Sequence, residues 1–215
     1  MPTNISLSFD DGHELDFKVA EVLRHYGLTA TFYWSMYNQK YQVMSQEKML
    51  QFVAKYPEME IAQHSLTHQI LTRITMEQCI EEIEKGKQWH FNMFGKDPEM
   101  FAYIRGYYTP LIAKMVREFG YIGARTIKSE KKLPDELKTF EMDGSLHLYH
   151  GEVLDRGGVK TWPNVRSYFL HSWEVEKYND WRMLEVFLST LKPTEVKTNG
   201  EICRNSILNN GIVDL

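Results

Sequence analysis

The sequence predicts an α/β protein built around a parallel sheet or barrel, and three observations lead to this prediction. Segments with the pattern of strands alternate with amphipathic helical segments along the chain. The helical connections are long enough for right-handed crossovers, which join parallel strands. Chemically reactive side chains also follow directly after the first, third and fourth strand-like segments. A (β/α) barrel carries its functional groups at the carboxyl ends of its strands in this way.

Seven segments have the character of strands. In the first of them, apolar Ile5, Leu7 and Phe9 alternate with serines, which predicts a strand with one buried face. The second segment, which ends at Trp34, is rich in β-branched and aromatic residues. The seven segments are residues 5–9, 29–34, 59–63, 100–104, 121–126, 145–150 and 167–173.

Helical segments separate these strands, and several of them begin with residues that favour helix starts. The hydroxyls of Ser45 and Thr75 can cap a helix, and Gln78 completes a capping box with Thr75. Thr109 precedes Pro110, and proline is favoured at the first helical position. The expected helices cover about residues 17–26, 46–56, 76–94, 110–119 and 181–191, the last of them capped by Asn179 or Asp180.

Length and composition fit one globular domain that covers residues 1–215. Of the 215 residues, 43% are hydrophobic and 25% are charged, which is typical of a globular protein with a sizeable core. The formal net charge of −4 offers no field that would attract nucleic acid. No window is long and apolar enough for a transmembrane helix. We therefore expect neither nucleic acid nor membrane as a partner, and the oligomeric state stays open.

Three local features bear on compartment and chemistry. The N-terminus leads directly into the first strand and leaves no room for a secretory signal, so we expect a cytoplasmic protein unless a leader has been removed. The two cysteines do not indicate a disulfide scaffold, and Cys79 fits a small buried hydrophobe on a helix. Residues 127–138 are polar and rich in lysine, which predicts an exposed loop.

Two adjacent carboxylates, Asp10 and Asp11, follow the first strand, and Gly12 permits the turn after them. Carboxylates this close repel each other unless a cation or a shared proton offsets their charge. His64 and His68 lie four residues apart after the third strand, so their imidazoles can converge on one metal ion. Two imidazoles and a carboxylate are the three protein ligands of a catalytic zinc site.

These two segments resemble a known pair of motifs. Phe9-Asp10-Asp11-Gly12 and His64-Ser65-Leu66-Thr67-His68 look like the first two motifs of the polysaccharide deacetylases, the NodB-homology group of carbohydrate esterase family four. The motifs occur in the family's order and at its separation, and the resemblance extends from about residue 4 to about Leu191. The family fold is a distorted (β/α) barrel, usually with seven strands, so the resemblance implies the fold that the alternation predicts.

The resemblance implies a role for each reactive group of these two motifs. Asp11, His64 and His68 would bind one divalent metal, and zinc suits imidazole and carboxylate ligands with an open position for water. Cobalt, nickel and manganese stay open as alternatives. Asp10 would be the general base, taking a proton from the water that attacks an amide carbonyl. The alternative for Asp10 is to support a histidine ligand by a hydrogen bond.

Arg105-Gly106-Tyr107-Tyr108 resembles the third family motif, in which proline and then an aromatic residue follow an arginine at the second and third positions. By that resemblance, Arg105 would orient and tune Asp10, and the backbone N–H of Tyr108 would donate to the oxyanion. Tyr107 stands where the family has proline, which leaves the shape of this loop open. The alternative is a surface arginine beside stacked tyrosines.

Leu170-His171-Ser172-Trp173 matches the fifth family motif. By that match His171 would be the general acid that protonates the leaving amine, since imidazole titrates near neutrality. The alternative is a half-buried structural histidine. The fourth motif, an Asp-rich stretch, has no counterpart, because the chain reads Gly123-Ala124-Arg125-Thr126-Ile127 at the expected place. The carboxylate partner of His171 is therefore not identified, and Glu174 and Asp143 are the candidates.

Together these residues predict a metal-dependent hydrolase that removes acetyl groups from N-acetylated sugars. The same site could instead act on an O-acetyl ester or on a small cyclic amide. A third possibility is a catalytically silent barrel that binds sugar, although a protein that only binds sugar would not need Asp10 and His171 together. The carbohydrate assignment follows from the resemblance alone, and the acetylated substrate stays open.

Overall fold

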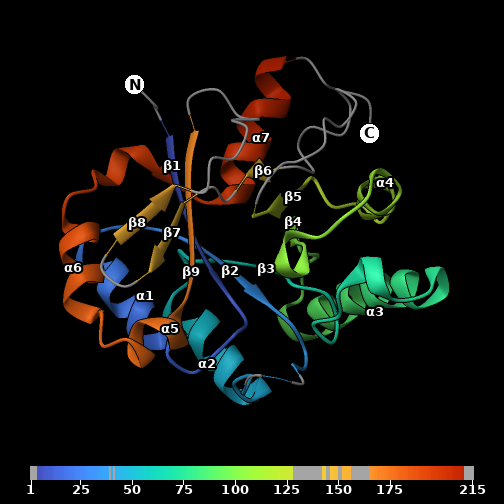
Figure 1. Ribbon diagram of the computed structural model, residues 1–215, viewed down its shortest axis with the longest axis horizontal. Coiled ribbons are helices and arrows are strands. Elements are labelled where there is room, and N and C mark those ends of the chain that lie inside the picture. The colour runs from blue at the N-terminus through green and yellow to red at the C-terminus, as the bar shows by residue number, and fades with distance from the viewer. Residues whose placement is uncertain are drawn as a thin grey trace.

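The computed structural model of the protein describes residues 4–38, 40, 42–127, 142–143, 146–149, 152–155 and 165–210. Its centre is a ten-stranded sheet surrounded by helices (Figure 1). Of the loop expected at 127–138, only Ile127 is described. Ser145 and His150, at the two ends of an expected strand, also lie outside the described residues.

The sheet is parallel in its described part except at one edge, where β8 runs antiparallel to β7. The strand order is β6-β5-β4-β3-β2-β1-β9-β7-β8, and β10 pairs with β1 off this path. The order does not return from β8 to β6 through the described residues, so the sheet forms an open, distorted barrel. This confirms the predicted fold class. The strands are β1 Asn4–Asp10, β2 Thr31–Trp34, β3 Glu60–Gln63, β4 Met100–Ala102, β5 Gly123–Thr126, β6 Met142–Asp143, β7 Leu146–Tyr149, β8 Glu152–Asp155, β9 Val165–His171 and β10 Val196–Lys197.

All seven predicted strands are present, as β1, β2, β3, β4, β5, β7 and β9. Three further strands, β6, β8 and β10, were not predicted. β6 and β10 have two residues each, which is too short for an alternating pattern to show. β8 is the second strand of a hairpin with β7.

Both faces of β1 are buried, which differs from the predicted strand with one buried face. Ser6 and Ser8 are completely buried because their face lines the inside of the barrel. There the hydroxyl of Ser6 donates to that of Ser167 on β9 at 2.9 Å. Side chains alternate along a strand, so Asp10 shares this inner face with the two serines. The pattern that places serines inside the barrel therefore also aims Asp10 at its mouth.

Helices surround the sheet, with α1, α5 and α6 on one side and α3 and α4 on the other (Figure 1). The helices are α1 Asp16–His25, α2 Gln46–Lys55, α3 Met76–Phe94, α4 Pro110–Glu118, α5 Ser172–Lys177, α6 Trp181–Ser189 and α7 Asn199–Asn210, with 3₁₀ turns η1 Leu71–Arg73, η2 Ile104–Gly106 and η4 Pro193–Glu195. The predictions of α1 to α4 and of α6 are confirmed. α5 and α7 were not predicted, because α5 is short and α7 has few apolar residues.

The predicted helix starts at Ser45, Thr75 and Thr109 are confirmed. The hydroxyl of Ser45 accepts from the backbone of α2, and that of Thr109 accepts from the backbone of α4. Thr75 and Gln78 form the complete capping box at the start of α3. The fourth prediction is only partly right, because Asp180 precedes α6 but makes no capping hydrogen bond with its side chain. Cys79 is buried on α3, as predicted.

Helix α7 closes the inside of the barrel at the amino ends of the strands. Its Ile202 and Cys203 pack against inward-facing side chains, among them that of Tyr33. The backbone N–H of Gly200 donates to the Glu60 carboxylate at 3.0 Å. A Cβ at Gly200 would clash with that carboxylate, which would then have to shift. The opposite end of the barrel is left for the functional site.

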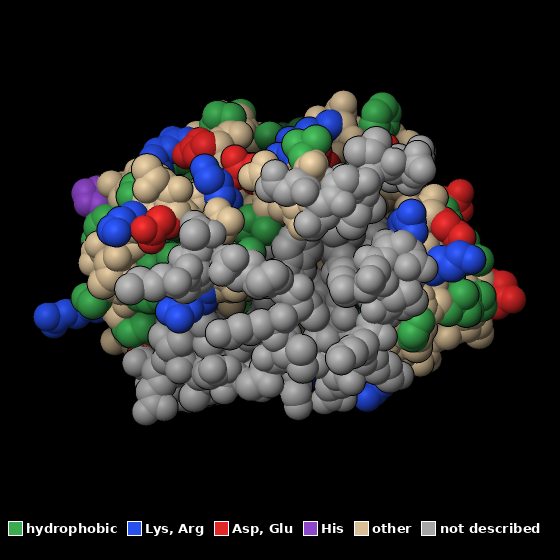
Figure 2. Space-filling view, turned by 90° about the horizontal axis from the view of Figure 1, so that it is seen from above, with side chains coloured by type: hydrophobic (Ala, Val, Ile, Leu, Met, Phe, Trp, Pro, Cys, Tyr) green, Lys and Arg blue, Asp and Glu red, His purple; other side chains and the backbone are tan. Residues whose placement is uncertain are grey.

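The surface shown in Figure 2 mixes charges of both signs. On the described part of this face, basic and acidic side chains lie interspersed. None of the helices in the described ranges combines the length and the apolar character that crossing a membrane requires.

Candidate active site and metal centre

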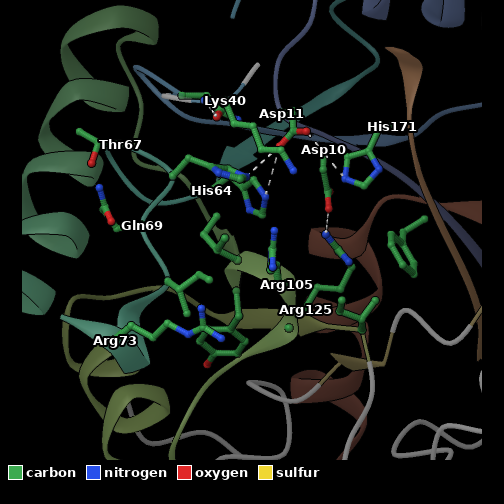
Figure 3. A pocket seen from close by; sticks show the side chains of 18 of the residues that line it. Asp10, Asp11, Lys40, His64, Thr67, Gln69, Arg73, Arg105, Arg125 and His171 are labelled. Atoms are coloured by element: carbon green, nitrogen blue, oxygen red, sulfur yellow. Dashed lines mark hydrogen bonds and ion pairs between the residues drawn. The ribbon is translucent and has the colours of Figure 1, made fainter. Parts of the chain in front are cut away.

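A cavity of about 460 Å³ opens at the carboxyl ends of the barrel strands. Asp10 reaches it from β1, Arg125 from β5 and His171 from β9, and Asp11 and His64 follow directly after β1 and β3 (Figure 3). Parallel strands bring their carboxyl ends to one edge, so residues from distant parts of the sequence meet here. All the predicted site residues except Tyr108 line this cavity.

The register between β1 and β9 sets Asp10 and His171 side by side. The two strands are parallel neighbours, and Asp10 is the partner of His171 in their pairing. On the other side, β2 pairs with β1 so that Tyr33 is the neighbour of Asp10. The predicted base and the predicted acid are therefore brought together by backbone hydrogen bonding, without any loop between them.

Arg125 holds one oxygen of Asp10. Its Nη2 donates to Asp10 Oδ2, and its guanidinium lies 5.0 Å and 5.1 Å from the ring centroids of Tyr33 and Phe169. Arg125 is only 1% exposed, so Asp10 balances a cation that would otherwise be costly inside the barrel. The other oxygen, Asp10 Oδ1, is buried and has no hydrogen-bond partner among the described residues. This oxygen is free to accept a proton.

Asp11, His64 and His68 place three potential metal ligands within 4.8 Å of one another. His68 Nε2 lies 2.9 Å from Asp11 Oδ1, and His64 Nε2 lies 3.9 Å from the same oxygen. The centroids of the two imidazole rings are 5.0 Å apart. Figure 3 marks the contact between His64 and Asp11. The three side chains therefore converge on one position at the edge of the cavity.

The hydrogen bonding of His64 fits a cation at that position. His64 Nδ1 lies 3.0 Å from the carbonyl oxygen of Ala102, which can only accept, so Nδ1 carries the proton. Burial lowers the pKa of His64 to about 4, although the charge of Asp10 opposes the shift, so the ring is neutral at pH 7. Nε2 then presents a lone pair toward the carboxylate of Asp11. Two acceptors that face each other fit a divalent metal such as zinc between them.

The backbone adopts left-handed conformations at two of the ligand positions. Asp11 has a φ of 81° and His68 a φ of 59°, in a region that costs a residue other than glycine about 1–3 kcal/mol. Helix α3 holds the histidine segment in place. The carboxylate of Glu82 accepts from the backbone N–H of Thr67 at 2.9 Å and from its hydroxyl at 2.5 Å. This clamp lies next to His68 and fixes the loop that carries it.

Trp173 fixes the second oxygen of Asp11. Its indole N–H donates to Asp11 Oδ2 at 2.9 Å, which leaves Oδ1 for the histidine side. Burial opposes the ionisation of Asp11, but the hydrogen bond from His68 and the charge of His171 outweigh it. Together they hold the pKa of Asp11 below its usual value. Asp11 is therefore an ionised carboxylate at neutral pH, the form that binds a metal.

Glu174 is the carboxylate partner of His171. His171 Nδ1 and Glu174 Oε2 are 2.7 Å apart, so Nε2 is the nitrogen that faces the cavity, 3.8 Å from Asp11 Oδ2. Burial lowers the pKa of His171, but the hydrogen bond to Glu174 and the charges of Asp11 and Asp10 outweigh it and raise the pKa to about 9. The other candidate partner, Asp143, lies in β6, and its side chain is outside the described part of the structure.

The third motif differs most from its predicted role. Arg105 lies in η2 with a φ of 55° and lines the cavity, but the guanidinium that contacts Asp10 is that of Arg125. Arg125 can make this contact because it lies within β5, on the inner face of the barrel, whereas Arg105 follows the end of β4. Tyr108 does not line the cavity, and its ring stacks on that of Tyr103 at 4.9 Å.

Arg125 and Asp16 are buried charged residues beside the site that were not predicted. Asp16 accepts from Trp34 Nε1 at 2.9 Å and from the Ser172 hydroxyl at 2.6 Å, and so links α1 to β2 and α5. Burial raises the pKa of Asp16 to about 8, against the effect of these two hydrogen bonds. Each residue leaves a signal in the sequence: an aspartate on the apolar face of a helix, and an arginine inside a strand of small residues.

Residues 2–124 match the family described as polysaccharide deacetylase. The comparison with curated proteins gave no match.

Solved structures with a similar fold cover most of the chain at low identity. A family 4 carbohydrate esterase from Streptomyces lividans, in complex with acetate, is 16% identical, with a TM-score of 0.60 and 91% of each chain covered. The Bc1960 peptidoglycan N-acetylglucosamine deacetylase is also 16% identical, with a TM-score of 0.61 over 91% of this chain and 86% of that one. The family 4 pseudoenzyme BA3943 from Bacillus anthracis is 13% identical, with a TM-score of 0.64 over 94% and 66%. At these identities the likeness shows a shared fold.

Proposed function

The chain belongs to the polysaccharide deacetylase family, and from this premise we propose that it is a metal-dependent hydrolase that removes acetyl groups from N-acetylated sugars. One observation carries the proposal. Asp10 keeps one carboxylate oxygen free while Arg125 holds the other, and it lies beside His171 on the neighbouring strand. One relative of the same fold is a peptidoglycan N-acetylglucosamine deacetylase, and another was solved with acetate, the product that deacetylation releases.

We propose that Asp11, His64 and His68 hold one divalent metal, with zinc as the first candidate. When bound, such an ion polarises the acetyl carbonyl and lowers the pKa of water. Trp173 orients the carboxylate by its hydrogen bond to Asp11, and the Ala102 carbonyl orients the ring of His64. Such partners of metal ligands fix the geometry that the ion requires.

Asp10 is the proposed general base. As the oxygen of water forms a bond to the acetyl carbon, Asp10 Oδ1 accepts the proton that the water loses. Arg125 keeps the carboxylate in one orientation, because it binds Oδ2 from inside the barrel. The same contact ensures that the oxygen left free is Oδ1.

His171 is the proposed general acid. Its Nε2 donates a proton to the sugar nitrogen as the carbon–nitrogen bond breaks, which releases acetate and a free amine. With a pKa of about 9 the imidazole is protonated at neutral pH, as an acid must be before the reaction. Glu174 orients the ring through Nδ1. The oxyanion donor at the Tyr108 amide stays a prediction, since Tyr108 does not line the cavity.

Acetate release tests the proposal. Protein loaded with zinc should release acetate from N-acetylglucosamine oligomers or from peptidoglycan, and chelation should stop the release until zinc or cobalt is added back. Acetylated xylan is the matched ester substrate. Release from xylan alone would replace the amide assignment with the ester one. Sugar binding without any release of acetate would contradict an enzyme and support the silent barrel.

A further inference from the structure

Among the described residues, two arginines of the cavity are not neutralised by a carboxylate. Three carboxylates of the described part of the chain line the cavity, and each is engaged, by Arg125, by His171 or by the histidines of the metal centre. Arg73 and Arg105 line the same cavity and are exposed. Within the described residues, neither arginine forms an ion pair with an acidic side chain. The cavity therefore presents two guanidinium groups that the proposed reaction does not use.

The turn that carries Arg105 is held rigidly. The Thr126 hydroxyl donates to the carbonyl of Gly106 at 2.8 Å, which ties the turn to the end of β5. Gly106 has a φ of 69°, and a Cβ there would lie 2.7 Å from the backbone nitrogen of Ile127, so the two segments are pressed together. Figure 3 shows the Arg105 side chain in the cavity beside Asp10, Asp11 and His64. The backbone that carries Arg105 is therefore held at the edge of the cavity.

Arg73 approaches the cavity from another side. It ends η1, and its guanidinium lies 5.8 Å from the ring centroid of Tyr107, within the range of a cation–π contact. In Figure 3 Arg73 lies across the cavity from Asp10. The Tyr107 ring steadies the guanidinium without neutralising its charge, so Arg73 stays available to an anion.

The chemistry of these groups identifies the kind of ligand that they suit. A guanidinium presents a planar fork of N–H donors that matches the oxygens of a carboxylate or a phosphate. A neutral N-acetylated sugar has no group that requires two such cations. The protein as a whole is acidic, with a net charge of −4, so general basicity does not account for the pair. Cations that line a cleft concentrate their field there and attract anions.

We propose that the acetylated sugar taken by this site carries an oxyanion, a carboxylate or a phosphate, and that Arg105 and Arg73 bind it. The inference rests on the proposed deacetylase function and narrows its substrate class. The two sources of the oxyanion share one recognition chemistry, and the choice of probes separates them.

Turnover of three sugars tests the inference. The zinc-loaded protein is assayed on neutral N-acetylglucosamine, on N-acetylglucosamine 6-phosphate and on N-acetylmuramic acid, which carries a carboxylate. We expect a higher kcat/KM for at least one of the anionic sugars. Arg105→Gln and Arg73→Gln should each lower that preference about 10- to 100-fold, the worth of a charge-assisted hydrogen bond, and mainly through KM. Arg182→Gln removes an exposed arginine of α6 that does not line the cavity and should leave the preference unchanged.

A binding measurement separates this inference from the proposed function. Calorimetry of the zinc-loaded protein with glucosamine, glucosamine 6-phosphate and muramic acid needs no turnover. If no sugar is deacetylated, the proposed function fails, while binding of the anionic sugars that depends on the arginines still supports the subsite. Equal affinity of an anionic sugar for wild type, Arg105→Gln and Arg73→Gln would overturn the inference, because the metal would then hold the anion. Equal kcat/KM for neutral and anionic sugars in the wild type would also overturn it.

Discussion

At the scale of single residues, the adjacent aspartates Asp10 and Asp11 have different surroundings, and we predict different losses when each is changed. Asp11 Oδ1 faces two imidazoles, so Asp11→Asn should lower the zinc content of the isolated protein. Asp10 contacts Arg125 instead, so Asp10→Asn should keep the metal and lose about 10²- to 10⁴-fold in kcat, the usual range for a general base. Metal analysis beside acetate release measures both effects. Equal loss of metal in the two variants would make Asp10 a ligand.

His171 is tested by the leaving group. An amine leaves only when it is protonated, whereas an activated phenol leaves without help. His171→Ala should therefore strongly slow the hydrolysis of N-acetyl sugars and spare 4-nitrophenyl acetate, with the metal content unchanged. Rates on both substrates for wild type and variant decide the matter. If both rates fall equally, His171 positions substrate or structure and does not donate a proton.

The pair of Glu174 and His171 predicts a pH dependence. Glu174 helps to raise the pKa of His171 to about 9, and the acid works only while it is protonated, so activity should fall on the alkaline side of that pKa. Glu174→Gln removes one of the charges that raise the pKa of His171, so the alkaline limb of kcat should move to lower pH. Glu176→Gln, on the same helix, changes an exposed carboxylate and serves as the control. If the alkaline limb of kcat stays at the same pH in Glu174→Gln, the group that titrates there is not His171.

At the scale of elements, Asp16 joins α1 to β2 and to the helix that follows His171, and we predict that it makes stability depend on pH. Burial raises the pKa of Asp16 to about 8 in the folded protein, against an ordinary value of about 3.9. Between these two pKa values the folded state binds one more proton than the unfolded state. The contribution of Asp16 to stability is therefore largest below about pH 4. It is lost as pH rises toward 8, by at most about 1.4 kcal/mol per pH unit.

Asn resembles the protonated carboxyl and can keep the hydrogen bonds with Trp34 and Ser172. Asp16→Asn should therefore flatten this slope, and at pH 8 the variant should be more stable than the wild type. Urea unfolding of metal-free protein between pH 5 and pH 8 measures the difference. Asp16→Ala should destabilise by about 1–3 kcal/mol at low pH, because it leaves buried donors unpaired. The same slope in wild type and Asp16→Asn would assign the titration to another group.

The sequence predicted those elements whose residues carry a local signal. The alternation at Ile5, Leu7 and Phe9 gives the strand, and the Thr75 hydroxyl gives the helix start, because both patterns lie within a few residues. α7 was missed since its stabilising contacts are distant, among them the Glu60 carboxylate that accepts from Gly200. The inner face of β1 was predicted to be exposed for a related reason. Serines in a strand are expected on its exposed face unless the barrel that surrounds them is known.

At the scale of the whole molecule, the site too has some features that the sequence predicts and others that depend on distant contacts. The predicted positions of Asp11, His64 and His68 meet because parallel strands end at one edge, which follows from chain order alone. The contact between Arg125 and Asp10 depends on how far the sheet curls, since β5 and β1 are separated by three strands in the sheet order. No local sequence pattern indicates how far the sheet curls. The resemblance to the third family motif therefore assigned the role of orienting Asp10 to Arg105, which stands at the arginine position of that motif.

Because the ligands come from the ends of two strands, metal binding should stabilise the fold as a whole. β1 contributes Asp11, and the segment after β3 contributes His64 and His68, so an ion held by all three ties together two loops that unfolding would separate. A ligand that binds only the folded state stabilises it by about 2.7 kcal/mol at a hundred times its Kd. For a chain of this size we expect zinc to raise the Tm by about 5–10 °C at that concentration.

Asp11→Asn should lose most of the rise, whereas Asp10→Asn should keep it, since Asp10 is bound to Arg125 and not to the proposed ion. Thermal unfolding of the three proteins, with zinc and with chelator, gives the comparison. A rise of the same size in Asp11→Asn would mean that zinc binds elsewhere, and the metal centre proposed at the mouth of the barrel would then be wrong.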